Sequence, residues 1–112
     1  MKKFLVLYRM DVAEMQKLMA STGEEERKKS MGKWEAWMKK NMASMADHGG
    51  PVGKTRRVAA SGMTDTRNDI GGYSIVQAES QEAAAALFAD SPHLTMPGAT
   101  AEVMEIMPMP GR

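Results

Sequence analysis

The stretch TGEEERKKSMGKWEAWMKKNMASMADHG, residues 22–49, has the pattern of one long amphipathic helix. Thr22 and Glu25 have the spacing of a capping box, and the Gly-Gly-Pro sequence at 49–51 is typical of a helix end. Its apolar residues recur every three or four positions, which places them on one helical face. These residues are Met31, Trp34, Met38, Met42 and Met45. We expect the rest of the chain to cover this face, with Trp37 off it, either over a sheet edge or dimer partner or lining a pocket with His48.

Four strands and two further helices are expected around the long helix. The segment 52–61 is polar enough to suggest an edge strand, and 62–69 is rich in turn-forming residues. The order strand, helices, strand, strand, helix, strand is typical of a ferredoxin-like β-α-β-β-α-β domain, an α+β fold with an antiparallel sheet. The expected strands are 3–10, 52–61, 70–79 and 99–107, and the expected shorter helices are 12–20 and 81–89.

The first expected strand predicts how the protein assembles. Residues 4–8, Phe-Leu-Val-Leu-Tyr, are apolar on both faces of the strand. Helices of the same chain can cover only one face of the sheet. We therefore expect a homodimer in which two sheets pack face to face.

Length and composition limit the classes of function. A chain of 112 residues fits one domain over 1–112, and a net charge of +1 gives no strong attraction to nucleic acid or to an anionic membrane. The chain has no cysteine, and its apolar runs are too short for a membrane span. We expect a cytoplasmic protein with neither a nucleic-acid nor a membrane partner.

Several segments together resemble the YCII-related family, particularly its DGPF-bearing branch. They are IGGYSIVQAES at 70–80, Glu82-Ala83, Pro92, MKKFLVLY at 1–8, EIMP at 105–108 and HGGPVG at 48–53. The resemblance implies a dimeric α+β barrel of ferredoxin-like protomers. Many family members carry an early histidine and aspartate suspected of acting as an acid–base pair, whereas this chain has no histidine before His48. The DGPF signature is also missing from 62–69.

Two familiar types of site are disfavoured by the sequence. Residues 48–55 end in Gly-Lys-Thr, but His48 stands where a phosphate-binding loop needs glycine, and a strand is expected where that loop needs a helix. The chain has 2 histidines and no carboxylate at ligand spacing beside them. We expect neither a metal nor a cofactor.

The remaining candidates for a ligand site are His48, Arg57, Tyr73 and His93. These polar residues lie near glycine turns and apolar strands, and the fork of Arg57 suits a carboxylate or phosphate. A small anionic ligand is therefore expected. The alternatives are that each histidine is structural or solvent-exposed and that Arg57 belongs to a solvated edge strand. Two classes of function remain open. One is a dimeric module that binds a small ligand or a partner protein, and the other is an enzyme that uses a histidine as general acid or base in a helix–sheet pocket.

Overall fold

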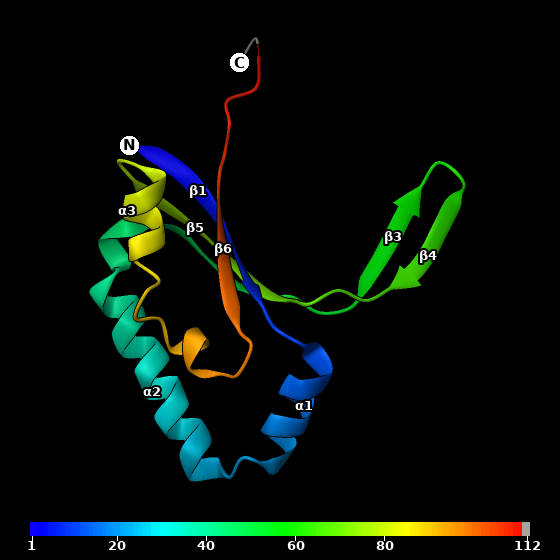
Figure 1. Cartoon of the computed structure of the whole chain (residues 1–112), viewed down its shortest axis with the longest axis vertical. Helices are drawn as coiled ribbons and strands as arrows, with labels where there is room; N and C mark the ends of the chain where they lie inside the picture. The colour runs from blue at the N-terminus through cyan, green and yellow to red at the C-terminus, as the bar shows by residue number, and fades with distance from the viewer. Residues whose placement is uncertain (111–112) are drawn as a thin grey trace.

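The computed structural model describes residues 1–110, apart from the side chain of Val12. Figure 1 shows a sheet that carries the helices, with a long hairpin projecting from one end. The strands are β1 (Lys2–Arg9), β2 (Met45–Pro51), β3 (Thr55–Ala59), β4 (Gly62–Thr66), β5 (Ile70–Ala78) and β6 (Thr100–Glu105). The helices are α1 (Val12–Ser21), α2 (Glu24–Lys40) and α3 (Gln81–Ala86), with short 3-10 helices η1 (Met42–Ser44) and η2 (Pro92–Thr95).

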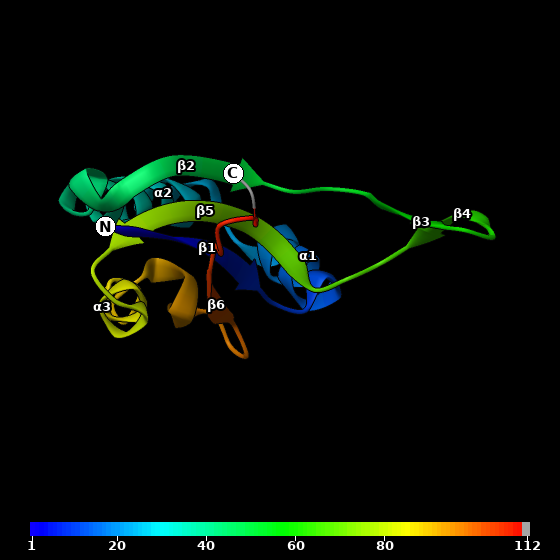
Figure 2. The ribbon, with the colours of Figure 1, turned by 90° about the horizontal axis from the view of Figure 1, so that it is seen from above.

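The main sheet has four strands in the order β2-β5-β1-β6, and each neighbouring pair is antiparallel. Strand β1 is central: Leu5 lies opposite Ile75 of β5 on one side and Met104 of β6 on the other. Figure 2 shows these strands side by side and the β3–β4 hairpin extending away from them. This strand order confirms the predicted α+β, ferredoxin-like fold.

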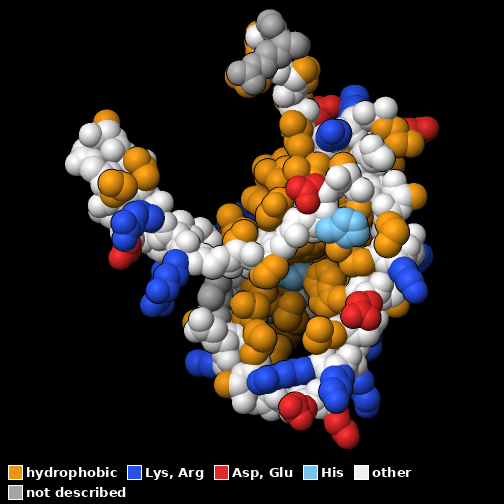
Figure 3. All heavy atoms as spheres, turned by 180° about the vertical axis from the view of Figure 1, so that it is seen from behind, with side chains coloured by type: hydrophobic (Ala, Val, Ile, Leu, Met, Phe, Trp, Pro, Cys, Tyr) orange, Lys and Arg blue, Asp and Glu red, His pale blue; other side chains and the backbone are white. Residues whose placement is uncertain are grey.

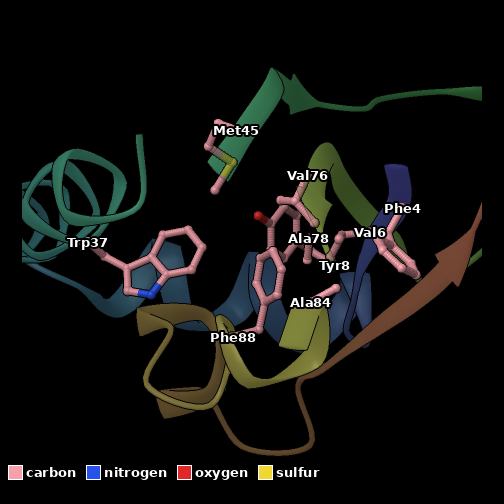
Figure 4. Close-up of a cluster of buried hydrophobic side chains, with 9 residues drawn as sticks. All are labelled: Phe4, Val6, Tyr8, Trp37, Met45, Val76, Ala78, Ala84 and Phe88. Carbon is pink, nitrogen blue, oxygen red and sulfur yellow. The ribbon is translucent and has the colours of Figure 1, made fainter. Parts of the chain in front are cut away.

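The hydrophobic core lies on one face of the sheet, beneath α2 and α3 (Figure 4). Strand alternation sends every second side chain of β1 into this core, while Leu5 and Leu7 point to the other face and are only half-buried. The core residues are Phe4, Val6, Tyr8, Trp37, Met45, Val76, Ala78, Ala84 and Phe88. No described helix covers the opposite face, which carries Leu5, Leu7, Tyr73, Ile75 and Met104.

The predicted extent of the long helix is wrong at its C-terminal end. Helix α2 stops at Lys40, and the Asn41 side chain donates a hydrogen bond of 2.9 Å to the carbonyl of Trp37. Residues 45–51, which were expected to be the end of this helix and the turn after it, form β2 and pair with β5. Pairing with the edge of β5 satisfies backbone groups at long range, and this outweighs the local helical spacing of the methionines.

The strand predicted over 52–61 is present as β3, but it does not join the main sheet. The loop predicted over 62–69 is wrong, because residues 62–66 form β4. Strand β3 pairs with β4 in a separate two-stranded sheet, with Val58 opposite Met63. The turn places Gly62 at a φ of 135°, which side-chain-bearing residues rarely adopt. Both Val58 and Met63 are largely exposed, at 74% and 67%.

The apolar face of α2 also differs from the predicted one. Met31 and Met42 are exposed, at 63% and 54%, whereas Trp37 is only 5% exposed and belongs to the core. Trp37 packs against Phe88 with ring centroids 5.2 Å apart, and its Nε1–H donates to Asp90 at 3.1 Å. Trp34 and Met38 of the predicted stripe do pack against the core, and Met45 belongs to it. The prediction was therefore wrong for Trp37 and for the two exposed methionines.

This core position of Trp37 gives a stability prediction. Trp37→Ala should lower the free energy of unfolding by about 3 kcal/mol or more, because it leaves a large cavity beside Phe88. Met31→Ala on the same helix should change it by less than about 0.5 kcal/mol. Urea unfolding followed by circular dichroism measures both, and equal losses would contradict this assignment of the buried face.

Candidate functional site

A cavity of about 350 Å³ opens between α1, α2 and the helix-covered face of the sheet. Figure 3 shows this hollow as a recess lined mainly by apolar side chains, with histidine side chains visible at it. Its residues are Tyr8, Met10, Met15, Trp34, Met38, His48, Gly50, Pro51, Gly71, Gly72, Tyr73, Ser74, His93 and Met96. Four methionines and a tryptophan give it an adaptable apolar wall, which suits a small organic molecule.

His93 is held rigidly at this cavity by the short helix η2. The Ser91 side chain accepts a hydrogen bond of 3.3 Å from the backbone N–H of His93, and the residue is 2% exposed. The ring Nε2 lies 3.1 Å from the carbonyl oxygen of Arg9 and 2.9 Å from that of Thr100. Carbonyl oxygens only accept, so Nε2 must carry the proton and donate it. In the neutral ring, Nδ1 then holds a lone pair, and no hydrogen bond to Nδ1 is formed by the described residues.

The backbone that holds His93 is itself braced on the other face of the sheet. The Arg9 guanidinium bonds Asp69 at 2.6 Å and Glu102 at 2.6 Å, which ties β1 to the start of β5 and to β6. The hydrogen bond to Arg9, with its charge, holds the pKa of Asp69 below its usual value. The pKa of Arg9 is raised by its bonds to Asp69 and then Glu102. These ion pairs hold the end of β1 in place, and with it the carbonyl of Arg9 that accepts the hydrogen bond from His93.

Tyr8 also lines the cavity, and its ring lies beside the ring of His93. The two rings are edge-on, with centroids 5.3 Å apart. The Tyr8 hydroxyl lies 2.9 Å from Ser74 Oγ, and Ser74 Oγ donates to the carbonyl oxygen of His48 at 3.1 Å. Burial raises the pKa of the Tyr8 phenol.

The position of the His48 carbonyl depends on a close approach of β2 to β5. Gly49 has a φ of 65°, and a Cβ built there would lie 1.9 Å from the carbonyl oxygen of Tyr73. The Asp47 side chain accepts a hydrogen bond of 2.9 Å from the Gly49 N–H and shapes this turn. Only glycine fits, so the turn predicted from the sequence lies inside β2 and brings His48 to Ser74.

The structure places the four predicted site residues in two regions. His48, Tyr73 and His93 border the cavity, although alternation points the Tyr73 side chain to the uncovered face of the sheet, opposite Leu7. Arg57 lies on β3, exposed, and does not line the cavity. Trp37 does not line it either, because it is in the core.

Neither Tyr8 nor Ser74 was among the site residues predicted from the sequence. Ser74 is a polar residue in the middle of an apolar strand and is 1% exposed, and such a residue needs a buried partner. That pattern was a usable signal, but the partner comes from a strand 66 positions away in sequence. The described residues contain no cluster of three or more potential metal ligands. No described helix has the length and apolar character needed to cross a membrane.

These features define a ferredoxin-like α+β protein with an apolar cavity and a buried histidine between helix and sheet. The YCII-related domain model matches residues 4–110, so the chain belongs to the YCII-related family. A comparison with curated protein sequences finds no match.

A solved structure with a similar fold is 5-chloro-2-hydroxyhydroquinone dehydrochlorinase (TftG) from Burkholderia phenoliruptrix AC1100, in complex with 2,5-dihydroxybenzoquinone. The TM-score is 0.51 and the sequence identity is 18%, over 89% of this chain and 90% of the other. At this identity the similarity shows a shared fold.

The buried phenol gives a prediction for alkaline pH. The folded-state pKa of Tyr8 lies above its ordinary value of 10.0. As the pH rises past that value, the unfolded chain loses this proton before the folded chain does, so the stability contributed by neutral Tyr8 declines. Tyr8→Phe should therefore remove part of the alkaline loss of stability. The phenolate absorbance difference between wild type and Tyr8→Phe isolates this group, and a Tyr8 midpoint at or below the ordinary value would contradict the prediction.

Proposed function

We propose that the protein binds a small organic molecule in the cavity between helices and sheet, and that His93 accepts a proton from it. One observation carries this proposal: a buried histidine borders a cavity of about 350 Å³ while its Nε2 proton is committed to two backbone carbonyls. The volume is within the range of small-molecule sites. The tautomer that the carbonyls select leaves Nδ1 as the basic nitrogen.

The proposed step is a single proton transfer. The O–H bond of a weakly acidic ligand breaks, its electron pair stays on the ligand, and the proton goes to Nδ1 of His93. The resulting imidazolium keeps its Nε2–H bonds to the carbonyls of Arg9 and Thr100. The ligand anion would then be paired with His93, in place of the Arg57 contact expected from the sequence.

Two functional classes fit this cavity, and different observations favour each. TftG has the same fold and, by its name, acts on a chlorinated hydroxyhydroquinone, which supports an enzyme acting on an aromatic-sized molecule. The described lining contains no Asp or Glu to act as a second acid–base group, which favours a binding module. Proton transfer to His93 is common to both. A cytoplasmic location and membership of the DGPF branch stay predictions.

The proton transfer can be observed with 4-nitrophenol, because its neutral and ionised forms differ in colour. At a pH where the free phenol is mostly neutral, wild type should bind it and raise the phenolate absorbance. His93→Gln should remove this rise, since its amide can still donate to the Arg9 and Thr100 carbonyls but has no basic nitrogen.

Trp34→Phe is the control for location. Trp34 lines the cavity, so its replacement should weaken binding of the phenol, whereas saturating phenol should still give the phenolate rise because His93 is unchanged. Absence of binding, or an equal phenolate signal in wild type and His93→Gln, would refute the proposed function.

The same proposal includes a homodimer of the dimeric α+β barrel type. The uncovered sheet face carries Leu5, Leu7, Tyr73, Ile75 and Met104, and a second copy of this sheet would bury it. The β3–β4 hairpin supports this assembly. It pairs only with itself in the described chain, and an isolated two-stranded hairpin is marginally stable in water.

Ile75→Lys tests the dimer. Wild type should sediment as a dimer at micromolar concentration, and Ile75→Lys should sediment as a monomer because it places a charge at the centre of the buried face. The lysine lies across from Asp47 on β2, so the monomer itself should tolerate the change. Ala85→Lys on exposed α3 is the matched control and should remain dimeric. A monomeric wild type would contradict the prediction.

A further inference from the structure

The hydrogen bonds that Tyr8 and His93 make within the protein determine which ligands the cavity can bind. We propose that the cavity selects a neutral ligand that donates two hydrogen bonds, with a benzenediol as the simplest representative, and discriminates against carboxylates and ethers of the same size. This inference rests on the proposed function, because it assigns the class of molecule that the cavity would hold.

The direction of the Tyr8 hydrogen bond follows from counting protons. Ser74 has one hydroxyl proton, and its contact with the carbonyl oxygen of His48 requires that proton because a carbonyl cannot donate. The bond between Tyr8 and Ser74 can then form only if the Tyr8 O–H donates to Ser74 Oγ. The Tyr8 oxygen is left with lone pairs and no proton to offer, so it can only accept a hydrogen bond from a ligand.

His93, like Tyr8, can only accept a hydrogen bond from a ligand while its ring is neutral. Its Nε2 proton is shared between the carbonyls of Arg9 and Thr100, so the neutral ring offers only the Nδ1 lone pair. Tyr8 and His93 are neighbours, with ring centroids 5.3 Å apart. Both residues line the cavity, so it presents two hydrogen-bond acceptors to one ligand.

The described lining contains no Lys or Arg, and Arg57 lies on the hairpin. The side chains of His48 and His93 are therefore the only ones in this lining that could carry a positive charge. A carboxylate entering this cavity would lose its hydration without a charged partner as long as both histidines are neutral. An aromatic body would pack well, because Trp34 and methionines such as Met38 and Met96 provide an apolar wall.

Ser74 is the positioning residue in this scheme, since it acts through the Tyr8 hydroxyl. Without its oxygen, Tyr8 could turn its proton toward the cavity and become a donor. Ser74→Ala should therefore change the preference of the cavity for one type of ligand over another, an effect that a purely structural role for the serine would not produce.

The test uses three probes of similar size at mildly alkaline pH, where an ordinary imidazole is neutral: resorcinol, 1,3-dimethoxybenzene and benzoate. Calorimetric titration of wild type should show resorcinol binding at least about tenfold more tightly than the diether or benzoate, which corresponds to two modest hydrogen bonds. In Ser74→Ala, the diether should gain affinity and resorcinol should lose it. Tyr8→Phe should weaken resorcinol binding severalfold and leave the diether unchanged.

Ser30→Ala, at an exposed position of α2, is the matched control and should behave as wild type. Thermal melting of each variant separates altered preference from loss of fold. If 4-nitrophenol transfers its proton to His93 but the diether or benzoate binds as tightly as resorcinol, this inference is overturned and the proposed function stands. If no aromatic probe binds, both are overturned. A preference for resorcinol that Ser74→Ala leaves unchanged would overturn the role of the Tyr8–Ser74–His48 chain.

Discussion

The central position of β1 is the constraint on which the rest of the structure depends. Because β1 pairs with β5 on one side and β6 on the other, its alternate side chains are divided between two faces of the sheet. Tyr8 points into the helix-covered face and Leu7 into the uncovered one. The last residue of the strand, Arg9, places its side chain between Asp69 and Glu102 and offers its carbonyl to His93. The cavity and the proposed dimer face are thus two sides of the same strand.

The site is built from backbone carbonyls as much as from side chains. The carbonyls of Arg9 and Thr100 accept hydrogen bonds from Nε2 of His93 and so determine its tautomer. The carbonyl of His48 takes the hydrogen bond of Ser74, which leaves Tyr8 to donate its proton to Ser74. Such groups have fixed positions once the sheet has formed, and they can only accept. The strand register therefore determines that the cavity offers acceptors, and no Lys, Arg, Asp or Glu side chain of the described lining takes part.

Much of the fold was open to prediction because it depends on local patterns. The strands at 2–9 and 70–78, the helix at 12–21 and the helix starting at 81 were predicted nearly as they occur, since alternation, capping residues and alanine-rich composition are short-range signals. The segments 41–51 and 62–66 were predicted wrongly. The methionines of the first have helical spacing, but the free edge of β5 offers backbone hydrogen bonds that no local pattern reveals. The burial of Trp37 was missed for a similar reason, because it depends on contacts with Phe88 and Asp90, which are distant in sequence.

The sequence by itself determined the class of fold, the apolar two-faced first strand and the small set of polar residues available for a site. Only the tertiary structure decided which of those residues meet. It brought His93 to the end of β1, where the hydrogen bond to Arg9 joins residues 84 positions apart and the His93 ring packs against Tyr8. It left Arg57 on a projecting hairpin. The physical reason is that a ligand site needs groups to converge in space, and convergence here follows from strand order and register, which are long-range properties of the folded chain.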